Sequence, residues 1–169
     1  MKRMVIYQSK TGFTKKYATW IAQELSCEAK ELKKVSSKEI EECDMVIFGG
    51  WIMAGNINGL DKIRNLHPKK LIVFGVGAMP DEEEYSEKIK TQNHLEETSF
   101  FYFQGGLAFE KMGFFSKMML NMVSKSLNKK ENKTEEEQEM VKLFAGSFDH
   151  ADMDHIKPLI EVVKENVYE

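Results

Sequence analysis

Three hydroxyl side chains and a glycine lie close together near the start of the chain. The segment is Ser9, Lys10, Thr11, Gly12, Phe13 and Thr14. It follows the apolar run Met4–Tyr7 and precedes residues 17–25, where apolar side chains recur at helical spacing, so a buried strand, a loop and a helix are predicted. Free N–H groups and the positive end of a helix dipole, together with hydroxyl donors, would bind a phosphate group. The alternative is a polar loop in which Thr11 or Thr14 only caps the helix.

The spacing excludes two other phosphate-binding motifs. The Walker pattern needs a second glycine followed by lysine and a hydroxyl residue, and the dinucleotide fingerprint needs three glycines; neither follows this strand. The segment Ser9–Thr14 instead resembles the [Ser/Thr]-x-Thr-Gly-x-Thr phosphate loop of the flavodoxin family, although Phe13 departs from the small or amide residue that is usual there. The resemblance implies that this loop binds the monophosphate of FMN.

Two later segments follow predicted strands and are predicted to contact the flavin ring. Residues 50–57 are unusually apolar for a loop and are bracketed by glycines, which suits cover over a flat aromatic ligand. The alternative is that Trp51 and Ile52 fold back onto the core. Residues 75–80 contain Gly75-Val76-Gly77, which permits close approach of a ligand. In flavodoxins, the ring-contacting loops occupy these two places.

The predicted FMN contacts come from all three segments. They are Ser9, Lys10, Thr11, Gly12, Phe13, Thr14, Trp51, Ile52, Met53, Ala54, Gly55, Gly77, Ala78 and Met79. No side chain is predicted to act as a catalytic acid or base, because a flavin itself carries the electrons.

Strands and helices are predicted to alternate along the chain. Strands are expected at 4–7, 26–32, 44–49, 70–75 and 98–104, with helices after them, including 60–66, 81–94 and a terminal helix at 152–167. Alternation favours parallel β-α units with right-handed crossovers. We therefore expect an α/β, three-layer doubly wound sandwich with a five-stranded parallel sheet. The resemblance to flavodoxins implies a flavodoxin-like sheet in the order 2-1-3-4-5. FMN would bind at the switch point beside the first and third strands.

A helical insertion, at about 106–148, is predicted after the fifth strand of what is otherwise a single domain over 1–169. Within 107–127 an apolar stripe faces away from Lys117 and Lys125; its members are Phe114, Phe115, Met118, Met119, Met122 and Val123. Three interpretations are open: packing against the domain body, a homodimer or redox-partner surface, and a peripheral membrane contact. Residues 129–138 are predicted to be a charged connection or a helix start.

The junction with this insertion narrows the resemblance. Residues 103–107, Phe-Gln-Gly-Gly-Leu, run into a Met- and aromatic-rich helix with interspersed lysines. This layout resembles the flavodoxin-domain branch that contains the menaquinone-dependent protoporphyrinogen dehydrogenases. The resemblance implies flavin-dependent oxidation at the membrane surface with electrons passed to a quinone. The main interpretation is an FMN-binding redox protein, either an electron carrier with a redox partner protein or a flavin-dependent oxidoreductase. The alternatives are a quinone-linked protoporphyrinogen dehydrogenase at the membrane surface and a binding module that has lost its cofactor, so it is open whether the protein is an enzyme.

Composition sets further limits. With 169 residues, 42% hydrophobic and 30% charged, the chain is typical of a single globular domain. A net charge of -3 argues against nucleic-acid binding. Cys27 and Cys43 are isolated and no secretory signal is present, so a cytoplasmic protein is predicted. If residues 107–127 make the peripheral membrane contact, the protein would lie at the inner face of the membrane.

A metal site and a nucleophile are not predicted. The acids and histidines of 149–155 do not have the spacing of a zinc site, and acids are expected there as caps of the terminal helix. His67 and His94 lie at predicted helix ends and form no catalytic pair.

Overall fold

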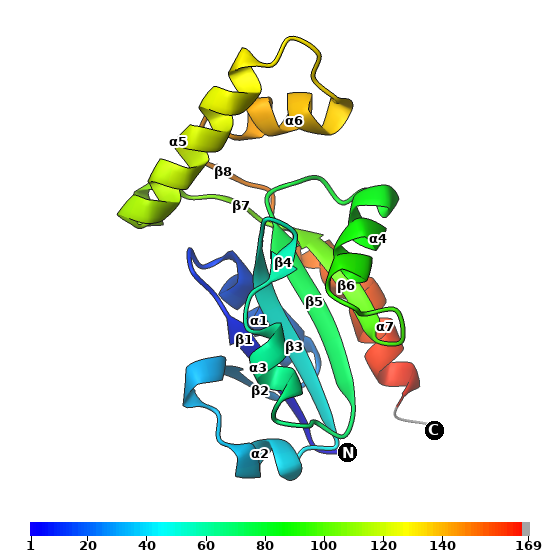
Figure 1. Ribbon diagram of the computed structural model, residues 1–169. Helices are drawn as coiled ribbons and strands as arrows, with labels where there is room; N and C mark the ends of the chain where they lie inside the picture. The colour runs from blue at the N-terminus through cyan, green and yellow to red at the C-terminus, as the bar shows by residue number, and fades with distance from the viewer. Residues whose placement is uncertain (167–169) are drawn as a thin grey trace.

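A computed structural model describes residues 1–166 and contains a parallel sheet of five strands (Figure 1). The strands are β1 (Arg3–Gln8), β2 (Glu28–Glu31), β3 (Met45–Met53), β5 (Leu71–Gly77) and β6 (Ser99–Gln104). Their order is β2-β1-β3-β5-β6, and all of these neighbours pair in parallel. The predicted order is confirmed; the numbers differ only because a short strand, β4 (Asn56–Ile57), lies between the third and fourth strands in the chain.

Helices cover both faces of the sheet. One face carries α1 (Phe13–Glu24) and α7 (Lys157–Glu165), which follows a 3-10 turn, η3 (Met153–Ile156). The other face carries η1 (Leu32–Lys34), α2 (Ser37–Glu41), α3 (Leu60–Arg64) and α4 (Glu83–Gln92). The three-layer sandwich is therefore as predicted, while Val167, the last apolar position of the predicted terminal helix, lies outside the described residues.

The alternation of strand side chains divides the buried residues into two cores. Val5 and Ile47 belong to the core under α1 and α7, whereas Ile6 and Phe48 belong to the core under α2, α3 and α4. Successive residues of a strand point to opposite faces, and both faces are buried, so the strands are apolar throughout. For this reason, the strands could be located in the sequence as short, continuous apolar runs.

The segment 50–57, which was predicted to be a loop, forms a β-hairpin in the structure. Residues 50–53 continue β3, which then turns at Ala54 and Gly55 and pairs antiparallel with β4. Gly49 is required by packing, since a Cβ there would lie 2.0 Å from the Phe74 ring. At Gly50, a Cβ would lie 2.4 Å from the carbonyl oxygen of Asn58. The glycines permit close packing within a longer strand and do not mark its end.

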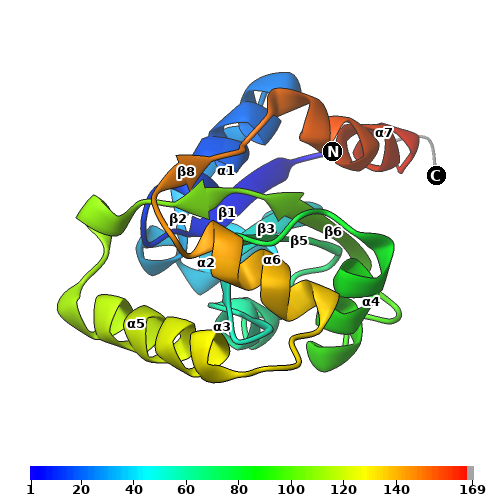
Figure 2. The same cartoon turned by 90° about the horizontal axis from the view of Figure 1, so that it is seen from above.

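The insertion leaves and rejoins the sheet through a two-stranded neck. β7 (Gly106–Leu107) pairs antiparallel with β8 (Phe148–Asp149). Between them lie η2 (Phe109–Lys111), α5 (Phe114–Lys129) and α6 (Glu135–Leu143). Both helices lie beyond the carboxyl ends of the parallel strands and extend across that end of the sheet (Figures 1 and 2). A capping box between Thr134 and Glu137 begins α6, which confirms the helix start predicted within 129–138.

The apolar stripe of α5 does not pack into the body of the domain. Phe114 is 77% exposed and Phe115 74%, and Met118 and Met122 are exposed as well. Met119 and Val123 are 42% and 39% exposed, and they also line the cavity described below. The interpretation that the stripe packs against the domain body is therefore wrong for Phe114, Phe115, Met118 and Met122. No helix within residues 1–166 is long and apolar enough to span a bilayer.

Candidate functional site

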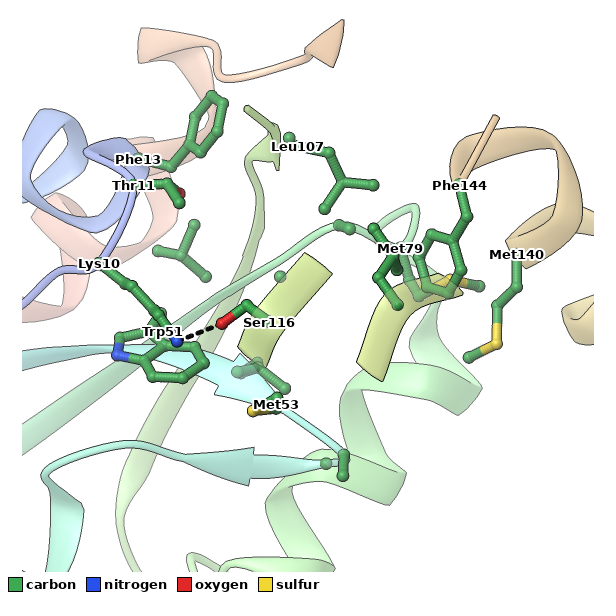
Figure 3. A pocket seen from close by; sticks show the side chains of 18 of the residues that line it. Lys10, Thr11, Phe13, Trp51, Met53, Met79, Leu107, Ser116, Met140 and Phe144 are labelled. Atoms are coloured by element: carbon green, nitrogen blue, oxygen red, sulfur yellow. Dashed lines mark hydrogen bonds between the residues drawn. The ribbon is translucent and has the colours of Figure 1, made fainter. Parts of the chain in front are cut away.

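A cavity of about 480 Å³ lies between the carboxyl ends of the strands and the insertion (Figure 3). Its floor is formed by the loop 9–14, the β3–β4 hairpin and the turn 76–79. Every predicted FMN contact except Gly12 lines it. Its volume lies within the range that small-molecule sites usually have, roughly 300–1,000 Å³. The three predicted segments therefore do meet at one place.

The roof comes from residues that sequence analysis did not assign to the site. They are Met112, Ser116, Met119, Leu120 and Val123, from α5 and the residues before it, with Met140 and Phe144 from α6 and its carboxyl end. Helical spacing showed the amphipathic character of α5, but apolar residues occupy both of its faces, so spacing alone could not assign one face to the cavity. Lys88 of α4 and Glu136 of α6 form an ion pair of 3.2 Å at the cavity wall.

The loop 9–14 has the backbone expected of an anion-binding helix start. Gly12, with φ 106°, is in the left-handed region that glycine adopts readily, and it is the N-cap of α1 without any side-chain cap. The Gly12 N–H donates to Ser9 Oγ at 3.2 Å. The alternative in which Thr11 or Thr14 caps the helix is therefore wrong. Both threonines line the cavity, and the first turn of α1 holds no acidic side chain that would oppose an anion.

Lys10 links this loop to the roof. Its Nζ donates to Ser116 Oγ on α5, and it lies 4.9 Å from the centre of the Trp51 ring (Figure 3). A cation over an aromatic face is attracted by the ring quadrupole. Lys10 thus holds a positive charge beside the loop and ties α5 to the floor of the cavity.

Phe13 packs against the neck of the insertion. A Cβ on Gly105 would lie 3.0 Å from Phe13 Cβ, and a Cβ on Gly106 would lie 2.8 Å from Phe13 Cζ. The unusual Phe13 and the Gly105-Gly106 pair therefore depend on each other, because a side chain at either glycine would crowd the Phe13 side chain. Phe13 also lines the cavity, so it joins the loop to the neck.

Polar residues at the end of α4 hold the tip of the hairpin. Asn93 is buried; its Nδ2 donates to Gly55 O at 2.7 Å, and its Oδ1 accepts from Ile57 N–H at 2.9 Å. Gln92 Nε2 donates to Ala54 O at 2.9 Å. The sequence carries no signal for these contacts, because polar residues at the end of a helix usually only cap it or face water.

Besides Lys10, Lys88 and Glu136, the titratable side chain that lines the cavity within residues 1–166 is Tyr85, while Asp149 and Asp152 lie outside its lining. Burial raises the pKa of Tyr85, which lines the cavity, to about 12. Asp149 accepts from Lys16 Nζ at 2.8 Å, and Asp152 accepts from the N–H of Asp154 at 2.9 Å at the start of η3. These acids therefore act in pairing and capping, and no cluster of metal-ligating side chains occurs within residues 1–166.

Comparison with known proteins agrees with this geometry. The family model of the flavodoxin domain matches residues 4–136. The chain belongs to the flavodoxin domain family. It is 33% identical over 96 residues to the flavodoxin-like domain-containing protein BilS of Clostridioides difficile (strain CD3), an alignment that covers 53% of this chain and 54% of BilS. The chain thus spans about half the length of this curated relative.

Solved flavodoxins resemble the chain at low identity. A flavodoxin from the domain Archaea is 15% identical, with a TM-score of 0.46, over 95% of this chain and 99% of that one. Oxidised Flavodoxin 1 from Bacillus cereus is 17% identical, with a TM-score of 0.46, over 66% of this chain and 89% of that one.

Proposed function

We propose that the protein binds FMN non-covalently and acts as a redox protein. One observation carries this proposal: a single cavity joins a hydroxyl-rich helix start at one end to apolar and aromatic walls at the other. An FMN molecule has the same two parts, a phosphate and a flat ring. The residues present therefore fit the cofactor that the resemblance implies.

Each segment has a separate role in holding the cofactor. Ser9, Thr11 and Thr14, with the N–H groups at the start of α1, would hold the phosphate. The β3–β4 hairpin and the turn 77–79 would lie along the ring, and the roof would exclude water. When bound, FMN supplies one- or two-electron transfer, while the chain orients it and determines its potential through ring contacts.

The roof favours a flavin-dependent oxidoreductase over an open electron carrier. Two helices of the insertion cover the cavity, so a protein partner would not reach the ring from that side, whereas a small apolar molecule would fit beneath Met119, Met140 and Phe144. Methionine side chains adapt to flat, polarisable ligands. The resemblance to the protoporphyrinogen dehydrogenases suggests a quinone as electron acceptor, and this is the second candidate function.

The first test is the visible spectrum and cofactor preference of the purified protein. We expect flavin absorption bands, and tighter binding of FMN than of riboflavin by the cofactor-free protein, because only FMN carries the phosphate. A colourless protein that also rejects added FMN would overturn the proposal and favour a binding module without a cofactor.

A second test separates the two redox functions. Reduced holoprotein is mixed with a soluble quinone analogue, and flavin reoxidation is followed by absorbance under nitrogen. Rapid reoxidation supports the oxidoreductase. If the bound flavin exchanges electrons only with a protein partner, the result supports the electron-carrier function instead.

We propose further that the outer face of α5 contacts an anionic membrane surface. Phe114, Phe115, Met118 and Met122 are exposed there, and α5 carries lysines at 117, 125 and 129 but no acidic side chain. Apolar side chains that enter the interface, with lysines near lipid phosphates, are typical of interfacial helices. The same proposal predicts that the protein lies in the cytoplasm, at the inner face of the membrane.

Vesicle sedimentation tests this surface. We expect binding to vesicles with phosphatidylglycerol, weaker binding to purely zwitterionic vesicles, and loss of binding in the double variant Phe114→Ser, Phe115→Ser. Met153→Ser is the matched control, since Met153 is an exposed methionine on η3, away from α5. A stable dimer that the double variant dissociates, without vesicle binding by either form, would identify a dimer surface and refute the membrane contact.

A further inference from the structure

The turn after β5 is fixed at three successive carbonyl oxygens, and all three donors come from β6 and the residue that follows it. The hydrogen bonds run from Gly105 N–H to Gly77 O at 2.7 Å, from Gln104 Nε2 to Ala78 O at 3.0 Å and from the Tyr102 hydroxyl to Met79 O at 2.6 Å. Tyr102 is buried, and burial raises the pKa of its phenol, so it remains a donor in the physiological pH range. The orientation of this turn is therefore determined by β6.

The N–H groups of the same turn must face the other way. In a trans peptide unit, the C=O and N–H bonds point in opposite directions. Because the Gly77 carbonyl points to the Gly105 N–H group and the Ala78 carbonyl to the Gln104 side chain, the N–H groups of Ala78 and Met79 point away from these donors. Ala78 and Met79 both line the cavity. Within residues 1–166, neither of these N–H groups has a hydrogen-bond partner.

The glycine at 77 makes this arrangement possible. A Cβ there would lie 2.7 Å from the Tyr102 hydroxyl oxygen, closer than real Cβ contacts come. The second glycine of Gly75-Val76-Gly77 thus leaves room for the hydroxyl that fixes the turn. This is a different role from the close approach to a ligand that the sequence pattern indicated.

We propose that Gln104 is a positioning residue, which directs the N–H group of Met79 at the flavin ring and thereby raises its reduction potential. The inference rests on the proposed FMN site. Tyr102 has no such role, because the peptide unit of the Met79 carbonyl ends at Pro80, which carries no N–H group. Gln104 does not line the cavity, so it acts only through the turn. Reduction adds negative charge to the acceptor atoms of the ring. A hydrogen bond to a charged acceptor is about twice as strong as a neutral one, so this donor favours the reduced form.

One variant tests the inference. Gln104→Met removes the hydrogen bond to the Ala78 carbonyl while keeping the length of the side chain. The matched control is Tyr17→Phe, which loses a hydroxyl that donates to Gln104 O at 2.5 Å but leaves both bonds to the turn in place. The measured quantities are the affinity of the cofactor-free protein for oxidised FMN and the reduction potential of the bound flavin.

We expect Gln104→Met to weaken binding of reduced FMN up to about tenfold more than binding of oxidised FMN. For a two-electron couple, tenfold corresponds to a potential about 30 mV lower. The control should keep the wild-type potential. Hydrogen exchange provides an independent readout, because the N–H group of Met79 should be protected by FMN in the wild type and less so in the variant.

The outcomes separate this inference from the function on which it rests. If the wild type does not bind FMN, the proposed function fails. If the wild type and Gln104→Met bind FMN with the same potential and the same exchange at Met79, only the positioning role is overturned. The same conclusion follows if Tyr17→Phe lowers the potential as much as Gln104→Met, since a general loss of packing would then explain the effect.

Discussion

The phosphate loop leads to a quantitative prediction for Thr11→Val. The substitution keeps the shape of the side chain and removes only its hydroxyl, which lies at the cavity in the half-buried loop before α1. A hydrogen bond to a charged acceptor is worth about 1.5–3 kcal/mol. Since 1.4 kcal/mol corresponds to a factor of ten in affinity, the dissociation constant of FMN should rise by about 10- to 150-fold.

Riboflavin provides the comparison that assigns the effect to the phosphate. It carries the same ring without the phosphate, so its affinity should be the same in Thr11→Val and in the wild type. Both ligands can be titrated into the cofactor-free protein by quenching of flavin fluorescence. The change in the ratio of the two dissociation constants, rather than either constant alone, is the quantity of interest.

Thr19→Val is the control for a general effect of losing a hydroxyl on α1. Thr19 is exposed, and its Oγ1 donates to Lys15 O at 2.8 Å within the helix. We expect no change in the affinity for either ligand. Equal losses of FMN and riboflavin affinity in Thr11→Val, or no loss of either, would refute the assignment of this loop to a phosphate.

Three further predictions concern stability. Gly106→Ala should lower the free energy of unfolding by about 1–3 kcal/mol in urea, because its Cβ would lie 2.1 Å from the Phe148 carbonyl oxygen, whereas Gly113→Ala, which points into open space, should not. Asn93→Leu should cost about 1–3 kcal/mol in the same assay, since it leaves a buried N–H of the hairpin without its acceptor. The hydrogen bond from the Lys30 ammonium lowers the pKa of Glu39 from 4.5 to about 2. A carboxylate whose pKa is lowered in the folded state stabilises the fold at pH values above its ordinary pKa, and this stabilisation is lost as the pH falls toward 2. Glu39→Gln should therefore lower the melting temperature at pH 6 and lower it less at pH 2.5.

The fold could be predicted from the sequence because its signals are local. Apolar runs such as Met4–Tyr7 mark strands that are buried on both faces, and the polar segment 9–14 marks the first turn at their carboxyl ends. The three candidate loops then met at one cavity, since the carboxyl ends of parallel strands lie at one edge of the sheet. Parallel pairing and right-handed connections left a small number of topologies, and the resemblance to flavodoxins indicated the strand order among them.

The remaining features depend on contacts between residues far apart in the chain. Gly49 and Gly50 look like a strand end until the Phe74 ring and Asn58 carbonyl that they accommodate are seen. The two apolar faces of α5 cannot be assigned to cavity and exterior from periodicity, because each contains large apolar side chains. Gln104 is separated by 26 positions from the carbonyl it holds, and no local pattern indicates such a contact.

The neck formed by β7 and β8 makes the insertion a self-contained appendage. Its two ends lie side by side, as the pairing of Gly106 with Asp149 and of Leu107 with Phe148 requires. A short hairpin loop could therefore replace the residues between β7 and β8 without altering the topology of the rest of the chain. Such a truncated protein would keep the loop 9–14 but leave the cavity uncovered. The reverse experiment would graft the same insertion onto an electron-carrying flavodoxin that lacks it. The insertion should then cover the exposed cofactor of that protein.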